Sequence, residues 1–189
     1  MRWWVFFIAL VVSIALDLAF VQVMQIDSLG ALVPCITIAL VVFVALFAPV
    51  SAALWAAWVA GLLLDLSLPQ ISGGQVTYFL IGPHALGFVA GAAVVLQMRT
   101  AVFRYRALTI GVLSLVAMMA AGIVVVAVHA VRLWLPWTDI SPGQAGLGLQ
   151  LVNFLGVSVY SGLVAIPIGW LLKCSWQWWG FTGSARTVV

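Results

Sequence analysis

Five ionisable side chains interrupt long apolar stretches of this sequence, and their types could do chemistry inside a membrane. They are Asp17, Asp65, His84, His129 and Arg132. A charge in hydrocarbon is costly, so such residues usually face protein or water and often mark a proton path, an ion site or a ligand site. Counted at about 1.5 Å per residue along the expected helices, all five fall in the outer half of the membrane.

The sequence leaves two interpretations of this intramembrane polar cluster open. In the first, the groups pair across helices and hold a bundle together, with Asp65 near Arg132 and Asp17 near His84. In the second, they line an outward-facing cavity for a small polar ligand. Because buried charges are usually paired, we favour the first. His84 has a simpler alternative, since a histidine beside Pro83 could bond a carbonyl that a proline kink frees.

No motif in the sequence would turn these residues into a catalytic or metal centre. There is no HExxH, no GxSxG, no P-loop and no paired-aspartate metal motif. The two cysteines, Cys35 and Cys174, have no metal-binding spacing and are expected at opposite faces of the membrane. We therefore expect no enzymatic activity, cofactor, metal or disulfide. A net charge of +3, spread along the chain, also argues against nucleic-acid binding.

The elements that must position these residues are membrane helices. The chain has 189 residues, of which 66% are hydrophobic and 6% are charged, whereas soluble domains carry about 25% charged residues. We expect one all-α integral membrane domain over residues 1–189. Residues 1–4 resemble the start of a signal peptide, but the apolar run continues to Met24 without a clear cleavage site. We therefore expect an uncleaved first span.

Hydrophobic segments predict six transmembrane helices and a tail. The expected spans are residues 3–24, 32–47, 50–66, 76–97, 107–133 and 148–172, followed by an interfacial, flexible tail at 173–189. Pro34 is expected in the first turn of the second span, and Pro83 is expected to kink the fourth. The second and third spans are short for a bilayer. They could form a re-entrant hairpin, which would require burial in protein, but we favour two spans.

The basic residues predict the orientation of these spans. With both termini in the cytoplasm, six of the seven basic residues lie inside and Arg132 alone lies outside, as the positive-inside rule requires. The six are Arg2, Arg99, Arg104, Arg106, Lys173 and Arg186. The link that carries Arg99, Arg104 and Arg106 could touch anionic lipid or a cytoskeletal partner, although setting the topology is its simpler role.

Two stripes of small residues are candidates for helix packing. Ala53, Ala57, Gly61 and Asp65 recur every four residues, so they share one helix face. Residues 15 and 19, both alanine, form a second stripe. Small side chains let another helix approach closely. We expect both stripes to accept a partner helix, with Asp65 fixing the register. In the alternative, Asp65 only ends its helix near the headgroups.

The pattern between Leu32 and Gly91 resembles the MreD family, the small membrane subunit of the bacterial rod-shape (elongasome) machinery. The matching features are Pro34, the string Ala60-Gly61-Leu62-Leu63-Leu64-Asp65-Leu66, Gly73 or Gly74, Tyr78, Leu80-Ile81-Gly82 and Gly87. The chain departs from the family at Cys35, where a polar residue is common, and at Pro83-His84.

The resemblance implies a non-enzymatic role in cell elongation at the bacterial inner membrane. It implies binding to MreC, a single-span periplasmic scaffold, and work with MreB, RodA and the transpeptidase partner of RodA in lateral peptidoglycan synthesis. A homodimer is a further possibility. The family fold is similar to the six-helix S components of energy-coupling-factor transporters, which bind vitamins. An S component is therefore the alternative function, and the stripe of Ala15 and Ala19 would suit its docking on a transport partner. The expected outer loops at 68–75 and 134–148 contain few hydrogen-bonding groups for a vitamin.

Overall fold

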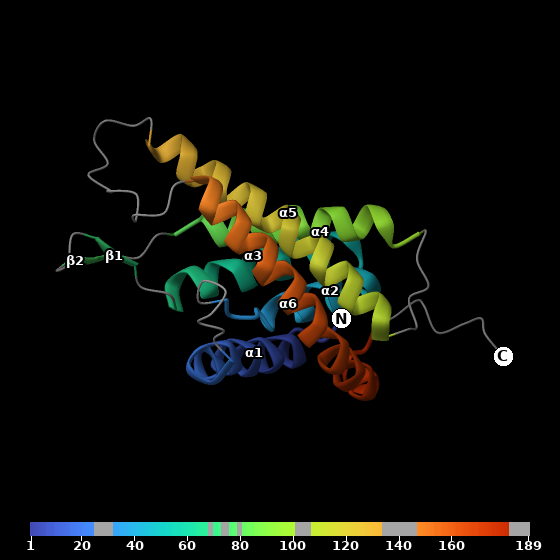
Figure 1. Cartoon of the computed structure of the whole chain (residues 1–189). Coiled ribbons are helices and arrows are strands. Elements are labelled where there is room, and N and C mark those ends of the chain that lie inside the picture. The colour runs from blue at the N-terminus through green and yellow to red at the C-terminus, as the bar shows by residue number, and fades with distance from the viewer. Residues whose placement is uncertain are drawn as a thin grey trace.

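The computed structural model describes residues 1–24, 32–67, 70–72, 76–78, 81–100, 107–133 and 147–181, with side chains at 1–19, 32–67, 81–100, 108–131 and 148–181. Its helices are α1 (Trp3–Met24), α2 (Thr37–Phe47), α3 (Val50–Ser67), α4 (Pro83–Met98), α5 (Ala107–Leu133), α6 (Leu147–Cys174) and α7 (Trp176–Trp179). Strands β1 (Gln70–Ser72) and β2 (Val76–Tyr78) pair antiparallel between α3 and α4 in the chain. This hairpin projects from one end of the helical bundle (Figure 1).

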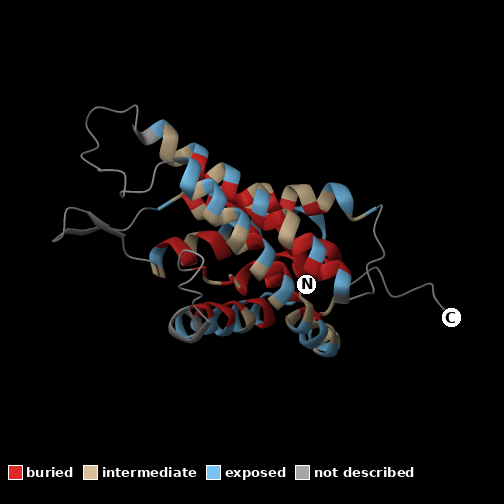
Figure 2. Cartoon of the chain, in the orientation of Figure 1, coloured by how far each residue is buried: buried red, intermediate tan, exposed pale blue. Residues whose placement is uncertain are grey.

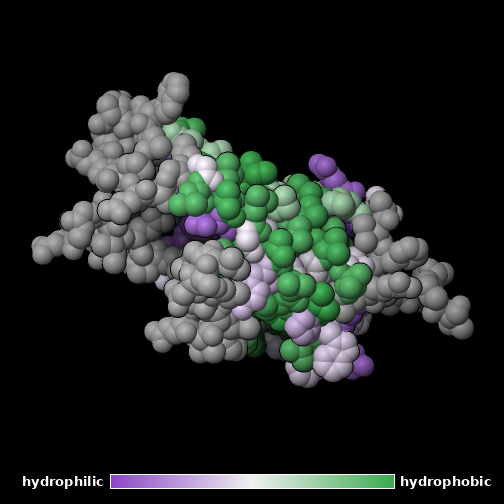
Figure 3. Space-filling view, viewed as in Figure 1, coloured by the Kyte–Doolittle hydropathy of each residue, from purple (hydrophilic) through white to green (hydrophobic). Residues whose placement is uncertain are grey.

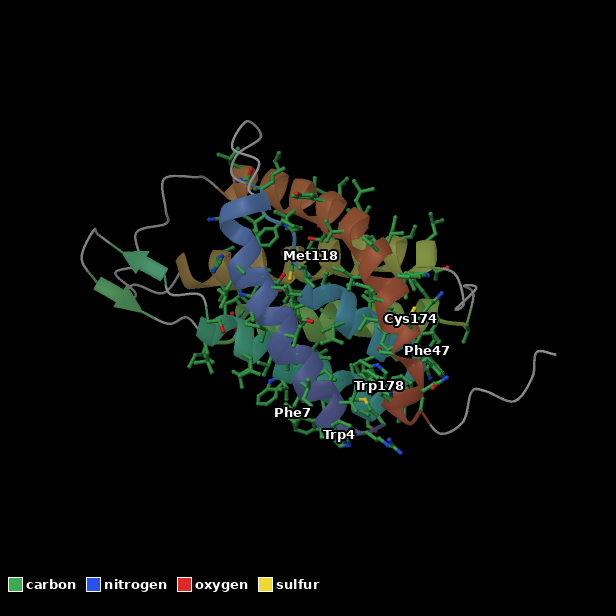
Figure 4. All side chains as sticks on the ribbon, turned by 90° about the horizontal axis from the view of Figure 1, so that it is seen from below. Trp4, Phe7, Phe47, Met118, Cys174 and Trp178 are labelled. Carbon is green, nitrogen blue, oxygen red and sulfur yellow. The ribbon has the colours of Figure 1, made fainter. Side chains whose placement is uncertain are left out.

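Helix α2 is the centre of the bundle. All eleven of its residues are buried, and it packs against α1, α3, α4, α5 and α6. Each of α3, α4 and α5 also packs against the helix that follows it. Helix α1 lies apart from that series, contacting α2, α3 and α7 among the described elements. Figure 2 shows the buried residues on the inner faces of the helices, and Figure 4 shows α2 between α1 and α6.

The described part of the chain contains three helices that are long and apolar enough to cross a membrane. They are Val50–Ser67, Leu108–Val131 and Gly148–Cys174, and shorter apolar helices occur at Trp3–Ala19, Thr37–Phe47 and Pro83–Met98. Apolar side chains also cover much of the described surface in Figure 3. These features are those of a membrane protein, but the prediction of six spans goes beyond them. The eleven residues of α2 rise only about 16 Å, against about 30 Å of hydrocarbon.

The structure corrects the start of two predicted spans. The second was predicted from residue 32, but α2 begins at Thr37, so Pro34 precedes the helix and does not lie in its first turn. The fourth was predicted from Val76, but residues 76–78 form β2 and α4 begins at Pro83. Pro83 is therefore the first residue of a helix, where its missing N–H costs nothing, and does not kink it. The other four helices begin and end within two residues of the predicted ranges.

The glycines of α4 explain how closely it packs on α5. A Cβ atom on Gly91 would lie 2.7 Å from the carbonyl oxygen of Ala117, and one on Gly87 would lie 3.0 Å from that of Ala121. The space for a side chain is thus taken by the backbone of α5. This close packing fixes the position of α4, including its N-terminus, relative to α5.

The beginning of the predicted tail is a packed element. Trp179 of α7 is only 1% exposed, and its ring lies 5.2 Å from that of Phe43 in α2, measured between centroids. Its indole Nε1 donates to Ser175 Oγ at 2.9 Å, and its carbonyl oxygen accepts from the backbone N–H of Arg2 at 2.9 Å. Residues 173–181 are therefore packed and not a flexible tail, their position at the membrane interface stays a prediction, and residues 182–189 lie outside the described part.

Trp179 and its neighbour Trp178 form a matched pair for a stability test. Trp178 is 66% exposed, whereas Trp179 fills the end of the α2 core. We expect Trp179→Ala to cost about 3 kcal/mol and to lower the midpoint of thermal unfolding in detergent by about 10 °C. Trp178→Ala should change stability by less than about 0.5 kcal/mol. Equal effects would show that α7 does not stabilise the bundle.

Candidate functional site

The carboxylate of Asp17 binds the N-terminus of α2 from the inner face of α1. Its Oδ1 accepts from the backbone N–H of Ile36 at 2.5 Å, and its Oδ2 accepts from that of Thr37 at 3.0 Å. Thr37 Oγ1 donates to the same Oδ2 at 2.5 Å, and Cys35 Sγ lies 3.8 Å from it. With 7% of its surface exposed, Asp17 caps α2 inside the protein.

A serine of α6 completes this capping site. The hydroxyl oxygen of Ser161 accepts from the backbone N–H of Cys35 at 2.9 Å. Ser161 is fully buried. Three consecutive N–H groups at the start of α2 are thus bonded by side chains of α1 and α6, which explains how an apolar helix can begin inside the bundle.

Asp65 does the same for α4. The backbone N–H groups of Gly82, His84 and Ala85 donate to its two oxygens at 2.8, 3.2 and 3.3 Å. The imidazole Nδ1 of His84 lies 2.6 Å from Oδ1. Asp65 is 3% exposed, so the simpler prediction, that it only ends its helix near the headgroups, is wrong.

The surroundings of both carboxylates explain their role. The first N–H groups of a helix have no partner within it and form the positive end of its dipole, so a carboxylate from a neighbouring helix is stabilised there. Asp17 is bonded to two backbone N–H groups and one hydroxyl, and Asp65 is bonded to three backbone N–H groups and the imidazole of His84. Such donors suit an anion and oppose a cation. Asp17 and Asp65 therefore position the two short helices, and this arrangement gives neither of them a metal-ligand environment.

The structure brings together only part of the predicted polar cluster. Asp65 bonds His84, whereas the predicted pair of Asp17 and His84 is wrong, because Asp17 is bonded at the start of α2. The suggestion that His84 bonds a carbonyl freed by a kink is also wrong, since it lies in the first turn of α4. His129 is half-buried in α5. The side chain of Arg132 lies outside the described part.

The two small-residue stripes have different environments. Ala53, Ala57 and Gly61 are buried with Asp65 on the face where α3 packs against α4. A Cβ atom on Gly61 would lie 2.4 Å from the carbonyl oxygen of His84 and 2.5 Å from Cα of Ala85. This stripe is filled by the chain's own α4, so the prediction that it accepts a partner helix is wrong.

The second stripe, on α1, stays open. Ala15 and Ala19 are both exposed on the side of α1 away from α2. Two large apolar residues nearer the start of the helix, Trp4 and Phe7, are exposed as well and are labelled in Figure 4. An apolar face with small residues at this position can be approached closely by another membrane helix.

A repeat in the sequence could have revealed the capping sites. Both carboxylates stand in the tripeptide Leu-Asp-Leu, at residues 16–18 and 64–66. A proline follows 17 residues after the first aspartate, at Pro34, and 18 residues after the second, at Pro83. In both cases the bonded N–H groups come 17 to 20 residues after the aspartate. The pairs α1–α2 and α3–α4 are thus built alike.

Comparison of the chain with protein-family models, with curated proteins and with solved structures gives no match. The geometry of the described helices and the pattern of the sequence therefore carry the functional argument.

Proposed function

We propose that this protein is a non-enzymatic membrane subunit of the MreD type, acting in the bacterial cell-elongation complex. The proposal starts from the resemblance between Leu32 and Gly91. One structural observation favours it over a solute-binding role, namely that Asp17 and Asp65 are bonded to the N-termini of the protein's own helices and His84 is bonded to Asp65. These three residues therefore act as fixed parts of the scaffold, which suits a protein that works by packing against others.

In this proposal the partner surface is the exposed face of α1. Ala15 and Ala19 lie on it, and α1 is held by α2, α3 and α7 alone among the described elements. The single membrane helix of MreC would pack along this small-residue face. The periplasmic part of MreC would then lie near RodA and the transpeptidase partner of RodA, which work with MreB in lateral wall synthesis. Neither the partner helix nor the larger complex requires a cofactor bound to this chain.

The orientation follows from the basic residues. The backbone N–H of Arg2 donates to the carbonyl oxygen of Trp179, so the start of α1 lies beside α7 at one end of the bundle. Arg99 lies at the same end, because its guanidinium donates to the carbonyl oxygen of Ala48 at the end of α2. We propose that this end faces the cytoplasm, in agreement with the positive-inside rule, in the bacterial inner membrane.

A vitamin-binding S component remains the second candidate, and one residue favours it. The Oε1 atom of Gln150, in the first turn of α6, is buried and has no hydrogen-bond partner among the described residues. A buried acceptor without a donor is costly, so a ligand that supplies an N–H or O–H would stabilise it.

Affinity purification of the tagged protein from its native membrane tests the proposal. We expect an MreC-like single-span protein and wall synthases to copurify, and we expect the Ala15→Leu/Ala19→Leu double variant to lose them, because leucine side chains prevent close approach. Ala127→Leu, on an exposed position of α5, is the matched control and should retain them. Recovery of ATPase subunits with a large membrane coupling protein would instead establish the transporter role. Unchanged recovery with the double variant would exclude the α1 face.

A further inference from the structure

A groove runs along the outer side of α3 and α4. It has a volume of about 490 Å³ and is lined by Ser51, Leu54, Trp55, Trp58 and Val89. The first four belong to α3 and the last to α4, and Ser51 is the only polar side chain among them. Small-molecule sites occupy about 300–1,000 Å³, so this groove is large enough for part of a ligand, and its lining requires that part to be apolar.

Two tryptophans form one wall of the groove. Trp55 is 61% exposed and Trp58 is 41% exposed, and their rings meet edge to face with centroids 5.8 Å apart. Counted from the start of α3, they lie about 8 and 12 Å along the helix. Tryptophan at such a depth ordinarily sits where its ring is in hydrocarbon and its N–H reaches the polar part of the lipid. Neither indole N–H has a hydrogen-bond partner within the described residues.

The shallow end of the groove lies beside a positive charge. Arg99, directly after α4, donates from a terminal guanidinium nitrogen to the carbonyl oxygen of Ala48 at 3.2 Å, which holds it next to the start of α3. Arg2 and Lys173 lie at the same end of the bundle. The two acidic residues of the described segments, Asp17 and Asp65, are near the opposite ends of α1 and α3. This end therefore attracts an anion.

We propose that this groove binds an anionic phospholipid, with one acyl chain against Trp55, Trp58 and Val89 and the phosphate beside Arg99. The indole N–H of Trp55 then donates to an ester carbonyl of the lipid, and the chain extends toward the middle of the membrane along α4. The site requires only that the protein lies in a membrane. It is therefore independent of whether the α1 face binds a scaffold protein or a transporter subunit.

Quenching of tryptophan fluorescence by brominated lipids tests this site. The protein is reconstituted into bilayers that contain equal mole fractions of phosphatidylglycerol or phosphatidylcholine with the same brominated chains. We expect stronger quenching by the brominated phosphatidylglycerol, and we expect most of this excess to be lost in the Trp55→Phe/Trp58→Phe variant. Trp170→Phe is the control, because Trp170 on α6 is also 61% exposed but lies outside the groove. It should retain the excess.

Two further variants separate the headgroup from the chain. Arg99→Gln should remove the preference for phosphatidylglycerol while leaving quenching by both lipids at the level of phosphatidylcholine. Val89→Phe should fill the groove and lower quenching of Trp55 and Trp58 by either lipid. The proposal is overturned if wild-type protein shows no preference between the lipids, or if the excess is the same in the groove variant and in Trp170→Phe. It is also overturned if a photoreactive residue in place of Leu54 captures a polypeptide and no lipid.

Discussion

Replacement of Asp65 by alanine is expected to destabilise the protein by about 4 kcal/mol, because it removes the acceptor for four hydrogen bonds at once. Three of the donors are backbone N–H groups at the start of α4, and the fourth is the ring of His84. In the buried setting of Asp65 these donors gain no substitute from the apolar neighbours. The midpoint of thermal unfolding in detergent should fall by about 12 °C.

Two other substitutions show whether the loss comes from the cap as a whole. His84→Ala removes one of the four bonds and leaves the backbone donors bonded, so we expect a cost of about 1 kcal/mol. Asp65→Asn retains one carbonyl oxygen but turns an NH₂ group toward N–H donors, so its cost should lie between the other two. If Asp65→Ala is no more harmful than His84→Ala, the backbone cap does not contribute to stability.

The long helices of this fold could be predicted from the sequence, and the short ones could not. Helices α1, α3, α5 and α6 follow continuous apolar segments, so composition alone defines them. The starts of α2 and α4 depend on carboxylates that come 17 to 20 residues earlier in the chain. The prediction of one apolar span from Val76 to Gln97 extended α4 into a strand. Hydropathy does not register the positive φ of 127° at Gly82, the residue directly before the start of α4 at Pro83.

The polar cluster shows the same limit in another form. Spacing along a helix gives the depth and the face of a residue, but it does not say which neighbour covers that face. The stripe that ends at Asp65 and the stripe of Ala15 and Ala19 look alike in the sequence, yet α4 covers the first and the second is exposed. Asp17 was expected to pair with a charged side chain, although the backbone N–H groups of a helix start serve equally well.

The buried stripe leads to the second prediction, which concerns Gly61. We expect Gly61→Ala to destabilise the protein by about 3 kcal/mol, although alanine is usually the better helix residue. The added Cβ would lie 2.4 Å from a carbonyl oxygen and 2.5 Å from a Cα atom of α4, and both are backbone atoms that cannot rotate away. Helix α4 must shift outward. This shift would also lengthen the hydrogen bonds between Asp65 and the N-terminal N–H groups of α4.

Gly148 provides the matched control for this substitution. It lies at the start of α6, and a Cβ atom there would meet nothing within 4 Å. Gly148→Ala should therefore stabilise the protein by about 0.5 kcal/mol through helix propensity alone. Thermal unfolding of both variants in the same detergent checks the prediction, and a Gly61→Ala protein as stable as Gly148→Ala would show that α3 and α4 do not pack this closely. If Gly61→Ala is destabilising, a binding partner lost on substitution of Gly61 would report a disturbed contact between α3 and α4 and not a lost binding surface. The α1 face must therefore be tested by substitution of its own exposed residues, Ala15 and Ala19.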